Sequence, residues 1–517
     1  MNKSTTKLIQ YALAASVLLP LFYVNFLMYM SGNILMAMGM LGLLVLGIFI
    51  YASHKGYVYR YLFPGLLGFL IFVIFPLIYT FWISFHKYDA RNLLTKERVE
   101  QILLSETFEP EGALGYAYKI YPGVSFNTYQ LALTPKDGPA TAEQLPPMFL
   151  SPEFSLPLVD DPQILDLSLS PTPPSGEALT LGEITRGKLH VMLRGLKLKL
   201  PDQQIVALSS LREFSTQKPV WEKTKDGGFK NLQDGTLIHA QSNSGFFETE
   251  DGERVGVGFR TWAGGENYSR IINDEQIKQP FVRIFFWTFA FAFLSMLTTF
   301  ALGMFLAVLL EWEGLKARTL YRTLLIFPYA VPAFLSILTF QGMFNQEFGA
   351  VNEFLGALFH ITPEWNTNPW LAKTMILIVN LWLGYPYMMI ICTGNLQSIS
   401  KSIYEASAID GSTPWANFKR LTLPLVLPPM IPVLIASFAF NFNNFNLIFL
   451  LTGGSPKMVG GAGIAGETDI LVTYTFNLAF KNSGADYGLA SAIATILFVI
   501  VGILAWLNLK KTQGSAS

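Results

Sequence analysis

Residues 284–310 read IFFWTFAFAFLSMLTTFALGMFLAVLL, a run without a single charged side chain. An α-helix rises about 1.5 Å per residue, so about 20 apolar residues suffice to cross the roughly 30 Å hydrocarbon core of a bilayer. A helix also satisfies its own backbone hydrogen bonds, which lipid cannot do. The run therefore predicts a transmembrane α-helix.

Charge-free stretches of similar length flank this one on both sides. The segment between Lys7 and Lys55 is long enough for two helices, with a turn expected near Ser31-Gly32-Asn33. A cleaved signal peptide is the alternative for the first helix, but the run exceeds the roughly 7–15 residues of a signal-peptide core. The other stretches are 61–85, 323–346, 374–400, 421–456 and 487–509. We therefore expect eight spans and an all-α polytopic membrane protein.

The distribution of charge divides the chain into three parts. Apolar residues make up 51% of the 517 residues and charged residues 14%, against about 25% charged residues in ordinary soluble domains. Residues 86–279 are the exception, with 20 Lys and Arg, 26 Asp and Glu, and a net charge of −6. We expect three spans in 1–85, a soluble domain in 86–279 and five spans in 280–511. The chain as a whole has no net charge, so nothing indicates a nucleic-acid partner.

The positions of Lys and Arg between the spans predict the orientation of the chain, because short cytoplasmic loops are enriched in these residues. If the N-terminus is cytoplasmic, the inner segments hold twelve Lys and Arg residues and the outer segments, apart from 86–279, hold four. We therefore expect both termini in the cytoplasm and the soluble domain on the opposite side of the membrane.

The soluble segment has the pattern of a β-rich domain. Apolar side chains alternate with other residues at 129–133, 189–193 and 196–200, a period typical of half-buried strands. No residue pattern indicates a catalytic or metal site, and the single cysteine, Cys392, excludes intrachain disulfides and cysteine-based zinc sites. The domain is either a docking surface or a structural appendage. Its length favours docking, because a connection between two spans needs far fewer residues.

Two features of many transport proteins are missing from the sequence. The charge-free stretches contain no Asp, Glu, Lys or Arg, whereas proton relays place such groups inside the bilayer. The sequence also lacks the G-x-x-x-x-G-K-[ST] loop that cradles ATP phosphates. The pattern disfavours proton-driven transport, and any ATP-driven motor is expected on a separate polypeptide. We expect neither a catalytic residue nor a cofactor in this chain.

Polar residues recur at positions i, i+4 and i+7 in two spans, so each set shares one helical face. These residues are Asn380, Gly384, Tyr387, Ser437, Asn441 and Asn444. An unpaired amide in hydrocarbon costs several kcal/mol, so the Asn side chains must meet partners, water or a ligand. One interpretation is hydrogen bonding between helices. The other is a neutral sugar whose hydroxyls pair with the amides and whose apolar face stacks on aromatic rings. The residues alone leave both open, but their lack of charge disfavours an ionic substrate.

A short helix, a tight turn and a second helix are expected at about 401–424, a cytoplasmic segment in the orientation above. Ser402 and Glu405 match an S-x-x-E capping box, and Gly411 suits the position after a helix end. Thr413 can cap the next helix, with Pro414 as its first residue. The pattern by itself is also compatible with an ordinary amphipathic surface loop.

The same segment resembles a family motif. Glu405-Ala406-Ser407, Gly411 and Leu421-Thr422-Leu423-Pro424 are similar to the EAA loop of binding-protein-dependent ABC importer permeases, E-A-A-x3-G-x9-[IL]-x-L-P. Ser407 replaces the second Ala, and Leu421 stands at a position often held by Ile. Nearly the whole chain resembles the larger permease subunit of maltose/maltodextrin importers, the MalF type, through its spans, its insert and strings such as 382–389 and 436–445.

The resemblance implies a type I ABC importer permease fold and a place in a complex of the bacterial inner membrane. Permeases of this type pair with a paralogous second permease and with two copies of an ATP-binding subunit. A periplasmic maltose-binding protein docks on the inserted domain, here 86–279. ATP on the partner subunits then drives maltose or maltodextrin across the membrane by alternating access.

The resemblance also implies roles for individual residues. Those that match the family's maltose site are Asn380, Gly384, Tyr387, Ser437, Phe440, Asn441 and Asn444. Those that match the helix coupled to the ATPase are Glu405, Ala406, Ser407 and Gly411. Two alternatives stay open: a secondary sugar carrier that works as a single chain, and a membrane-anchored sensor or assembly protein.

Overall fold

The chain divides into two compact units, Met1–Ser84 and Phe85–Ser517. The computed structural model describes residues 3–30, 34–52, 54–123, 127–136, 148–155, 163–174, 176–187, 189–312, 314–459, 463–481 and 485–514. The turn expected near Ser31-Gly32-Asn33 lies outside these ranges.

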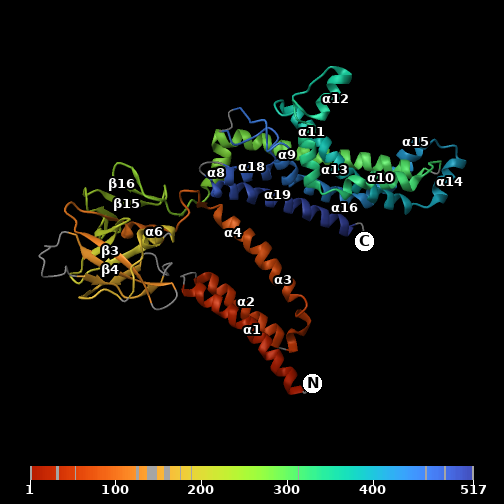
Figure 1. Ribbon diagram of the computed structural model, residues 1–517. Coiled ribbons are helices and arrows are strands. Elements are labelled where there is room, and N and C mark those ends of the chain that lie inside the picture. Colours follow the sequence, from red (N-terminus) through yellow and green to blue (C-terminus); the bar gives the residue numbers. More distant parts are fainter. Residues whose placement is uncertain are drawn as a thin grey trace. The chain divides into compact units, whose positions relative to one another are not determined.

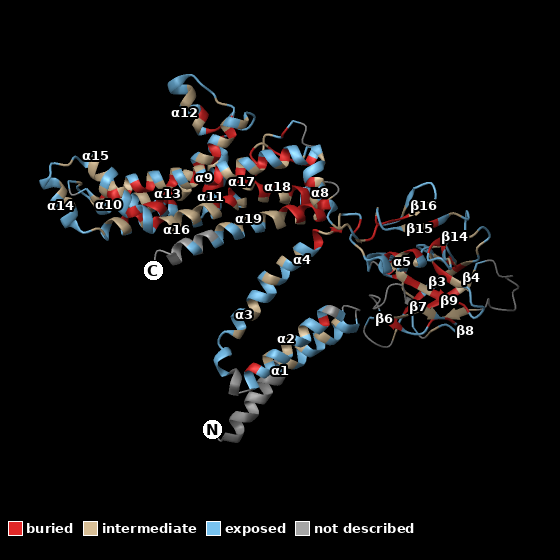
Figure 2. Ribbon diagram, turned by 180° about the vertical axis from the view of Figure 1, so that it is seen from behind, coloured by how far each residue is buried: buried red, intermediate tan, exposed pale blue. Residues whose placement is uncertain are grey.

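The first unit consists of apolar helices. The elements are α1 (Lys3–Met30), α2 (Ile34–Ala52), η1 (His54–Tyr59), α3 (Phe63–Phe69), the π-helical turn η2 (Leu70–Ile74) and α4 (Phe75–Ile83). α1 packs against α2, and Asn25 Nδ2 donates to the Ala37 carbonyl at 2.8 Å. The segments α3, η2 and α4 form one apolar helix of 21 residues, and none of the residues in its most apolar window is buried. Figure 2 shows this exposure along α3 and α4, as expected for a helix whose surroundings are lipid or another chain.

The membrane part of the second unit is a bundle of long apolar helices (Figure 1). Its main helices are α9 (Glu275–Glu311), α10 (Arg318–Ala330), α11 (Ala333–Met343), α12 (Ala350–Phe359), α13 (Pro369–Gln397), α16 (Leu423–Phe442), α17 (Phe445–Leu451), α18 (Leu471–Phe476) and α19 (Tyr487–Gly514). α9 packs along both α13 and α16, and buried residues gather where these helices meet (Figure 2). Among the described residues of the whole chain, five helices are long and apolar enough to cross a membrane, or six if the bent pair α10–α11 is one span.

Two of the expected spans are interrupted. The span expected at 323–346 is bent by 88° between α10 and α11, with Val331 in an extended conformation (φ −88°, ψ 131°). Pro332 accounts for the bend, because a residue before proline is disfavoured in the helical conformation. The span expected at 421–456 is also not continuous: α16 ends at Phe442, and α17 begins at Phe445. Residues at both breaks, among them Val331 and Asn444, line a cavity.

The closeness of α9 and α13 depends on a glycine. A Cβ added at Gly303 of α9 would lie 2.6 Å from Met388 Cβ and 2.8 Å from the Met389 backbone nitrogen. Neither atom can move away without shifting α13. By contrast, a Cβ added at Gly394, on α13 itself, meets nothing within 4 Å.

We therefore expect Gly303→Val to lower the melting temperature of the purified protein sharply, because overpacking a well-packed core costs about 1–3 kcal/mol or more. Gly394→Val is the matched control, with the same change at an open helical position, and should melt close to the parent. Thermal unfolding in detergent, followed by intrinsic tryptophan fluorescence, measures both. Equal melting temperatures for the two variants would contradict the close packing of α9 and α13.

The segment between the two membrane parts is rich in β-strands, as expected. Among its described residues, a nine-stranded sheet has the order β7-β9-β10-β11-β3-β4-β5-β8, with β6 paired to β4, and a second sheet has the order β13-β14-β15-β16-β17. The first sheet comprises β3 (Gly115–Pro122), β4 (Thr128–Pro135), β5 (Met148–Leu150), β6 (Phe154–Ser155), β7 (Gln163–Asp166), β8 (Ser168–Ser170), β9 (Leu196–Lys199), β10 (Ile205–Ser210) and β11 (Glu213–Thr216). The second comprises β13 (Trp221–Lys223), β14 (Phe229–Asn231), β15 (Leu237–Gln241), β16 (Phe246–Thr249) and β17 (Arg254–Val255). Each sheet covers its own apolar cluster, with Phe214 in one and Phe247 in the other fully buried.

One of the three strand predictions was wrong. Residues 129–133 lie in β4, and 196–199 form β9, but 189–192 form a short helix, α7 (Leu189–Met192). Leu189 and Leu193 are buried, whereas Val191 is 50% exposed. Leu189 and Leu193 are also four residues apart, which places them on one helical face. Alternation over only five residues therefore fits a helix as well as a strand.

The inserted segment leaves and rejoins the membrane part through paired strands. β1 (His86–Lys87) pairs antiparallel with β18 (Thr261–Trp262), just before α8 (Glu266–Asn273). Arg270 of α8 forms an ion pair with Asp486 at 2.8 Å, and the Tyr88 carbonyl accepts from the Gly488 backbone N–H at 2.9 Å. The base of the insert is therefore tied to the beginning of α19.

Candidate functional site

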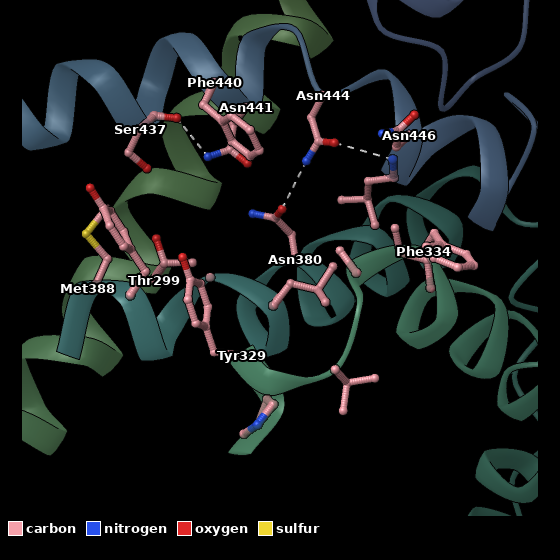
Figure 3. Close-up of a pocket in the computed structure, with 18 of the residues that line it drawn as sticks. Thr299, Tyr329, Phe334, Asn380, Met388, Ser437, Phe440, Asn441, Asn444 and Asn446 are labelled. Carbon is pink, nitrogen blue, oxygen red and sulfur yellow. Dashed lines mark hydrogen bonds between the residues drawn. The ribbon is translucent and has the colours of Figure 1, made fainter. Parts of the chain in front are cut away.

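A cavity of about 890 Å³ opens inside the helical bundle. Its walls come from α9, the α10–α11 bend, α13, α16 and the start of α17 (Figure 3). All seven residues that the sequence suggested for substrate binding line this one cavity: Asn380, Gly384, Tyr387, Ser437, Phe440, Asn441 and Asn444. None of the described residues that line it carries a charge.

α13 supplies the first set of these residues from one continuous helix. Asn368 caps its N-terminus through Oδ1, and Asn380, Gly384 and Tyr387 follow on the face toward the cavity. A Cβ at Gly384 would lie 2.7 Å from Thr299 Cγ2 of α9. Glycine at this position therefore lets α9 approach α13 and brings the Thr299 side chain to the cavity wall.

The second set spans the break between α16 and α17. Ser437 and Asn441 lie on α16, but Asn444 follows the end of that helix, so the three do not share one continuous helical face as expected. Asn444 instead caps α17, accepting from the Leu447 N–H at 3.3 Å, and its Nδ2 donates to Asn380 Oδ1 at 3.5 Å (Figure 3). The break turns Asn444 toward α13 and links the two polar sets.

Asn441 has an incomplete set of hydrogen bonds. It is 4% exposed, and its Nδ2 donates to the Ser437 carbonyl at 2.9 Å. Its Oδ1 is buried and has no hydrogen-bond partner among the described residues. An unmet buried acceptor costs about 1–3 kcal/mol. A ligand hydroxyl in the cavity would remove that cost once the amide turned its oxygen toward the cavity.

Aromatic rings stand beside these amides. Phe440 is 71% exposed and Tyr387 44% exposed, and both line the cavity. Amide groups that can donate and accept, next to uncharged aromatic faces, suit a ligand with many hydroxyls and an apolar face. The described lining residues offer no opposite charge to an ionic ligand.

The cavity also contains residues that the sequence did not suggest. They include Thr299, Tyr329, Phe334 and Asn446. Asn446 ends the Asn-rich string 441–446, which reads NFNNFN, and could have been found there because it is the fourth Asn in six residues. Thr299, Tyr329 and Phe334 carry no such signal, since only the packing of α9 and the α10–α11 bend brings them to the cavity.

The segment at 401–424 forms the expected short helix and tight turn. The second helix does not end near Leu423-Pro424 as expected but continues from Pro414 to Phe442, through a π-helical turn at Phe418–Thr422. α14 (Lys401–Ile409) ends in a Schellman arrangement: the Gly411 N–H donates to the Ala408 carbonyl, and the Ser412 N–H to the Ser407 carbonyl, both at 3.1 Å. Gly411 has φ +72°, as its position requires. Thr413 caps α15 (Pro414–Asn417) as expected, accepting from the Ala416 N–H at 3.3 Å.

The expected capping box is wrong. α14 begins at Lys401, so Ser402 and Glu405 lie inside the helix, and the Ser402 hydroxyl bonds to that of Ser400 at 2.7 Å. Two side-chain bonds hold α14 against the following segment instead: Ser407 Oγ donates to Asn417 Oδ1 at 2.5 Å, and the hydroxyls of Tyr404 and Thr422 are 2.9 Å apart. Glu405, Ala406 and Gly411 are exposed, and Ile409 is 87% exposed. α14 therefore presents an exposed surface while the two side-chain bonds hold it in place.

Comparison with known proteins gives consistent matches. Residues 94–264 match the family described as maltose transport system permease protein MalF P2 domain, and 299–512 match the family described as binding-protein-dependent transport system inner membrane component. The maltose/maltodextrin transport system permease protein MalF of Klebsiella aerogenes is 45% identical over 498 residues, 95% of this chain and 94% of the relative. The protein of the same name from Escherichia coli (strain K12) is 43% identical with the same coverage. A crystal structure of a bacterial ABC transporter involved in the import of the acidic polysaccharide alginate aligns with 48% of this chain and 84% of its own, at 22% identity and a TM-score of 0.41.

Proposed function

Because this chain belongs to the MalF family of binding-protein-dependent inner-membrane permeases, we propose that maltose and maltodextrins cross the membrane through the cavity described above. The chain is a permease subunit of such an importer and a multi-pass protein of the inner membrane. It is a transport component without a catalytic site of its own.

The observation that carries this proposal is the unmet Asn441 Oδ1 in an uncharged cavity with exposed rings. A sugar hydroxyl donates to Asn441 Oδ1, and neighbouring hydroxyls pair with Asn380 and Asn444. Phe440 and Tyr387 stack on the C–H faces of the pyranose rings. Ser437 supplies a further hydroxyl, and Gly384 leaves room beside Thr299. Binding gives Asn441 Oδ1 a partner and exchanges the other groups' bonds to water for bonds to the sugar, so the site is selective without needing a charge.

The energy comes from other subunits of the ABC complex. The complex contains a paralogous second permease and two copies of an ATP-binding subunit. Glu405, Ala406 and Ser407 of α14, ended by Gly411, dock on an ATP-binding subunit. The Schellman turn and the two side-chain bonds support this role, because a braced helix transmits a movement of its partner to α13 and α16. ATP-driven closure of the partner subunits then switches the cavity between its inward-facing and outward-facing states.

The topology follows from the positive charges between the spans. Both termini lie in the cytoplasm, and the insert lies in the periplasm, where a maltose-binding protein docks on it. The functional parts are then the spans of 1–85, the docking domain 86–279 and the permease core 280–511. The excess of Lys and Arg on the inner side supports this orientation.

Reconstitution tests the function directly. The purified complex in proteoliposomes should accumulate labelled maltose only when ATP and liganded binding protein are supplied on the correct sides. The chain alone should give neither accumulation nor counterflow. Counterflow by the single chain would instead identify a secondary carrier. A complete absence of flux with the intact complex would favour a sensor or assembly protein.

We expect the excised segment 86–279 to fold and to bind maltose-binding protein. Its two sheets enclose their own apolar clusters, and only α8 and the first residues of α9 lose buried contacts with the bundle. Isothermal titration should give a saturable heat with maltose-binding protein and none with an unrelated periplasmic sugar-binding protein. Circular dichroism and a cooperative melt establish that the fragment is folded. A folded fragment without a binding signal would identify the segment as a structural appendage.

A further inference from the structure

The far end of the cavity holds a second combination of an amide and an aromatic ring. Figure 3 shows Ser437 and Met388 at one end, Asn380 and Asn444 in the middle, and Asn446 and Phe334 at the other end. Asn446 lies in the first turn of α17, and Phe334 in the first turn of α11. α11 and α17 pack against each other, so the two residues belong to one part of the wall.

Asn446 is available to a ligand. Its side chain is exposed, it lines the cavity, and no hydrogen bond joins its amide to another described residue. The other three residues of the Asn-rich string bond to the protein: Asn441 to Ser437, Asn443 to Ala439, and Asn444 to Asn380. A free amide in the membrane part of a protein needs water or a ligand, because hydrocarbon provides no partner. Phe334, 53% exposed, supplies an apolar face next to it.

The volume of the cavity leaves room for part of a ligand at the Asn446 end. At about 890 Å³ the cavity lies near the upper end of the range of about 300–1,000 Å³ for small-molecule sites. The polar groups at Asn441, Asn380 and Asn444 occupy only one end and the middle of it (Figure 3). An oligosaccharide longer than a disaccharide would extend past Asn444 toward the α10–α11 bend and reach the end at Asn446.

We propose that Asn446, with Phe334, is a specificity-determining residue that binds an additional glucosyl ring and so favours maltodextrins longer than maltose. This inference rests on the function proposed above. Asn446 pairs with ring hydroxyls through its amide, and Phe334 packs on the ring's C–H face. Maltose fills the end at Asn441 and does not need this contact.

The test compares two sugars in one reconstituted complex. Initial uptake of labelled maltose and maltotriose is measured at subsaturating concentrations in proteoliposomes that contain the whole complex and the same binding protein. Asn446→Val should lower the ratio of maltotriose uptake to maltose uptake about fivefold relative to the parent, the factor that corresponds to losing one neutral hydrogen bond. Preferences of the binding protein cancel, because it is identical in both preparations.

Asn443→Val is the matched control. Asn443 is an amide of the same segment, three residues away; its Nδ2 donates to the Ala439 carbonyl of α16, and it is not among the described residues that line the cavity. This variant should leave the ratio unchanged. If Asn446→Val does not assemble, Phe334→Leu, which removes the ring, is expected to lower the same ratio.

The outcomes separate the two proposals. A parent complex that moves neither sugar overturns the proposed function and this inference together. A parent that moves both sugars, with the same ratio in the Asn446→Val or Phe334→Leu variant, overturns the inference alone. A ratio that falls equally in the Asn443→Val control also overturns it, because the effect would then belong to the α16–α17 break and not to Asn446.

Discussion

Replacement of Asn441 by Leu is expected to reduce maltose uptake by the reconstituted complex at least about a hundredfold. Leu keeps a similar side-chain size but removes both amide atoms. A sugar hydroxyl in the buried cavity would then lose its acceptor at Oδ1, and burying a polar group without a partner costs about 3 kcal/mol or more. The amide's own bond to the Ser437 carbonyl, at 2.9 Å, is lost as well.

Co-purification of the complex distinguishes a sugar-binding defect from a folding defect in this variant. The ATP-binding subunits should still co-purify, because Asn441 lies on the cavity side of α16, away from α14. Asn443→Leu, the same change outside the cavity, should retain most of the uptake. Unchanged maltose uptake by Asn441→Leu would show that the cavity does not carry the sugar.

Replacement of Gly411 by Val is expected to abolish most of the ATP hydrolysis that liganded binding protein stimulates. Gly411 has φ +72°, and a side chain in this left-handed region costs about 1–2 kcal/mol, with a β-branched residue at the unfavourable end. A Cβ added there meets nothing within 4 Å, so the cost comes from the backbone and not from a clash. The strain would open the Schellman turn and release the end of α14 from its docking geometry.

The measurement for this variant is ATP hydrolysis stimulated by liganded binding protein. Gly411→Val should show little stimulation or poor co-purification of the ATP-binding subunits. Gly411→Asn is the matched control, because Asn tolerates the left-handed region better than other residues with a side chain. It should keep most of the stimulation. Normal stimulation in the Val variant would mean that the turn after α14 does not control coupling.

The sequence pattern predicted the structure correctly where the interactions that determine it lie between residues close together in the chain. The charge-free run at 284–310 lies within α9, and the alternation at 196–200 covers β9. Gly411 and Thr413 occupy the helix-end positions that their residue types favour. Pattern failed at 189–193, where a short period fitted two structures, and at Ser402, where the helix begins before the motif. At 189–193 the burial of Leu189 and Leu193 decided the outcome, and at Ser402 the helix begins one residue earlier, at Lys401.

The residues of the candidate site also divide into those that the sequence spacing placed correctly and those that only the packing brings to the cavity. The residues Asn380, Gly384 and Tyr387 share a face because α13 is continuous, which the spacing predicted. Asn444 reaches the same cavity for a different reason, since the helix ends at Phe442 and Asn444 turns to cap α17. Thr299 reaches it only because Gly384 lets α9 come close.

The amino-acid sequence by itself determined which segments are helical and apolar, which segment is a charged β-rich insert, and which uncharged amides lie in the membrane part, because hydropathy and period depend on near neighbours. Pro332 permits a bend between α10 and α11, but only the tertiary structure set its angle of 88°. Only the tertiary structure also decided that α16 stops short of Asn444, and that Asn446 and Phe334 share a wall with Asn441. The reason is physical: a cavity is formed by helices far apart in the sequence, and its shape depends on how closely their backbones pack.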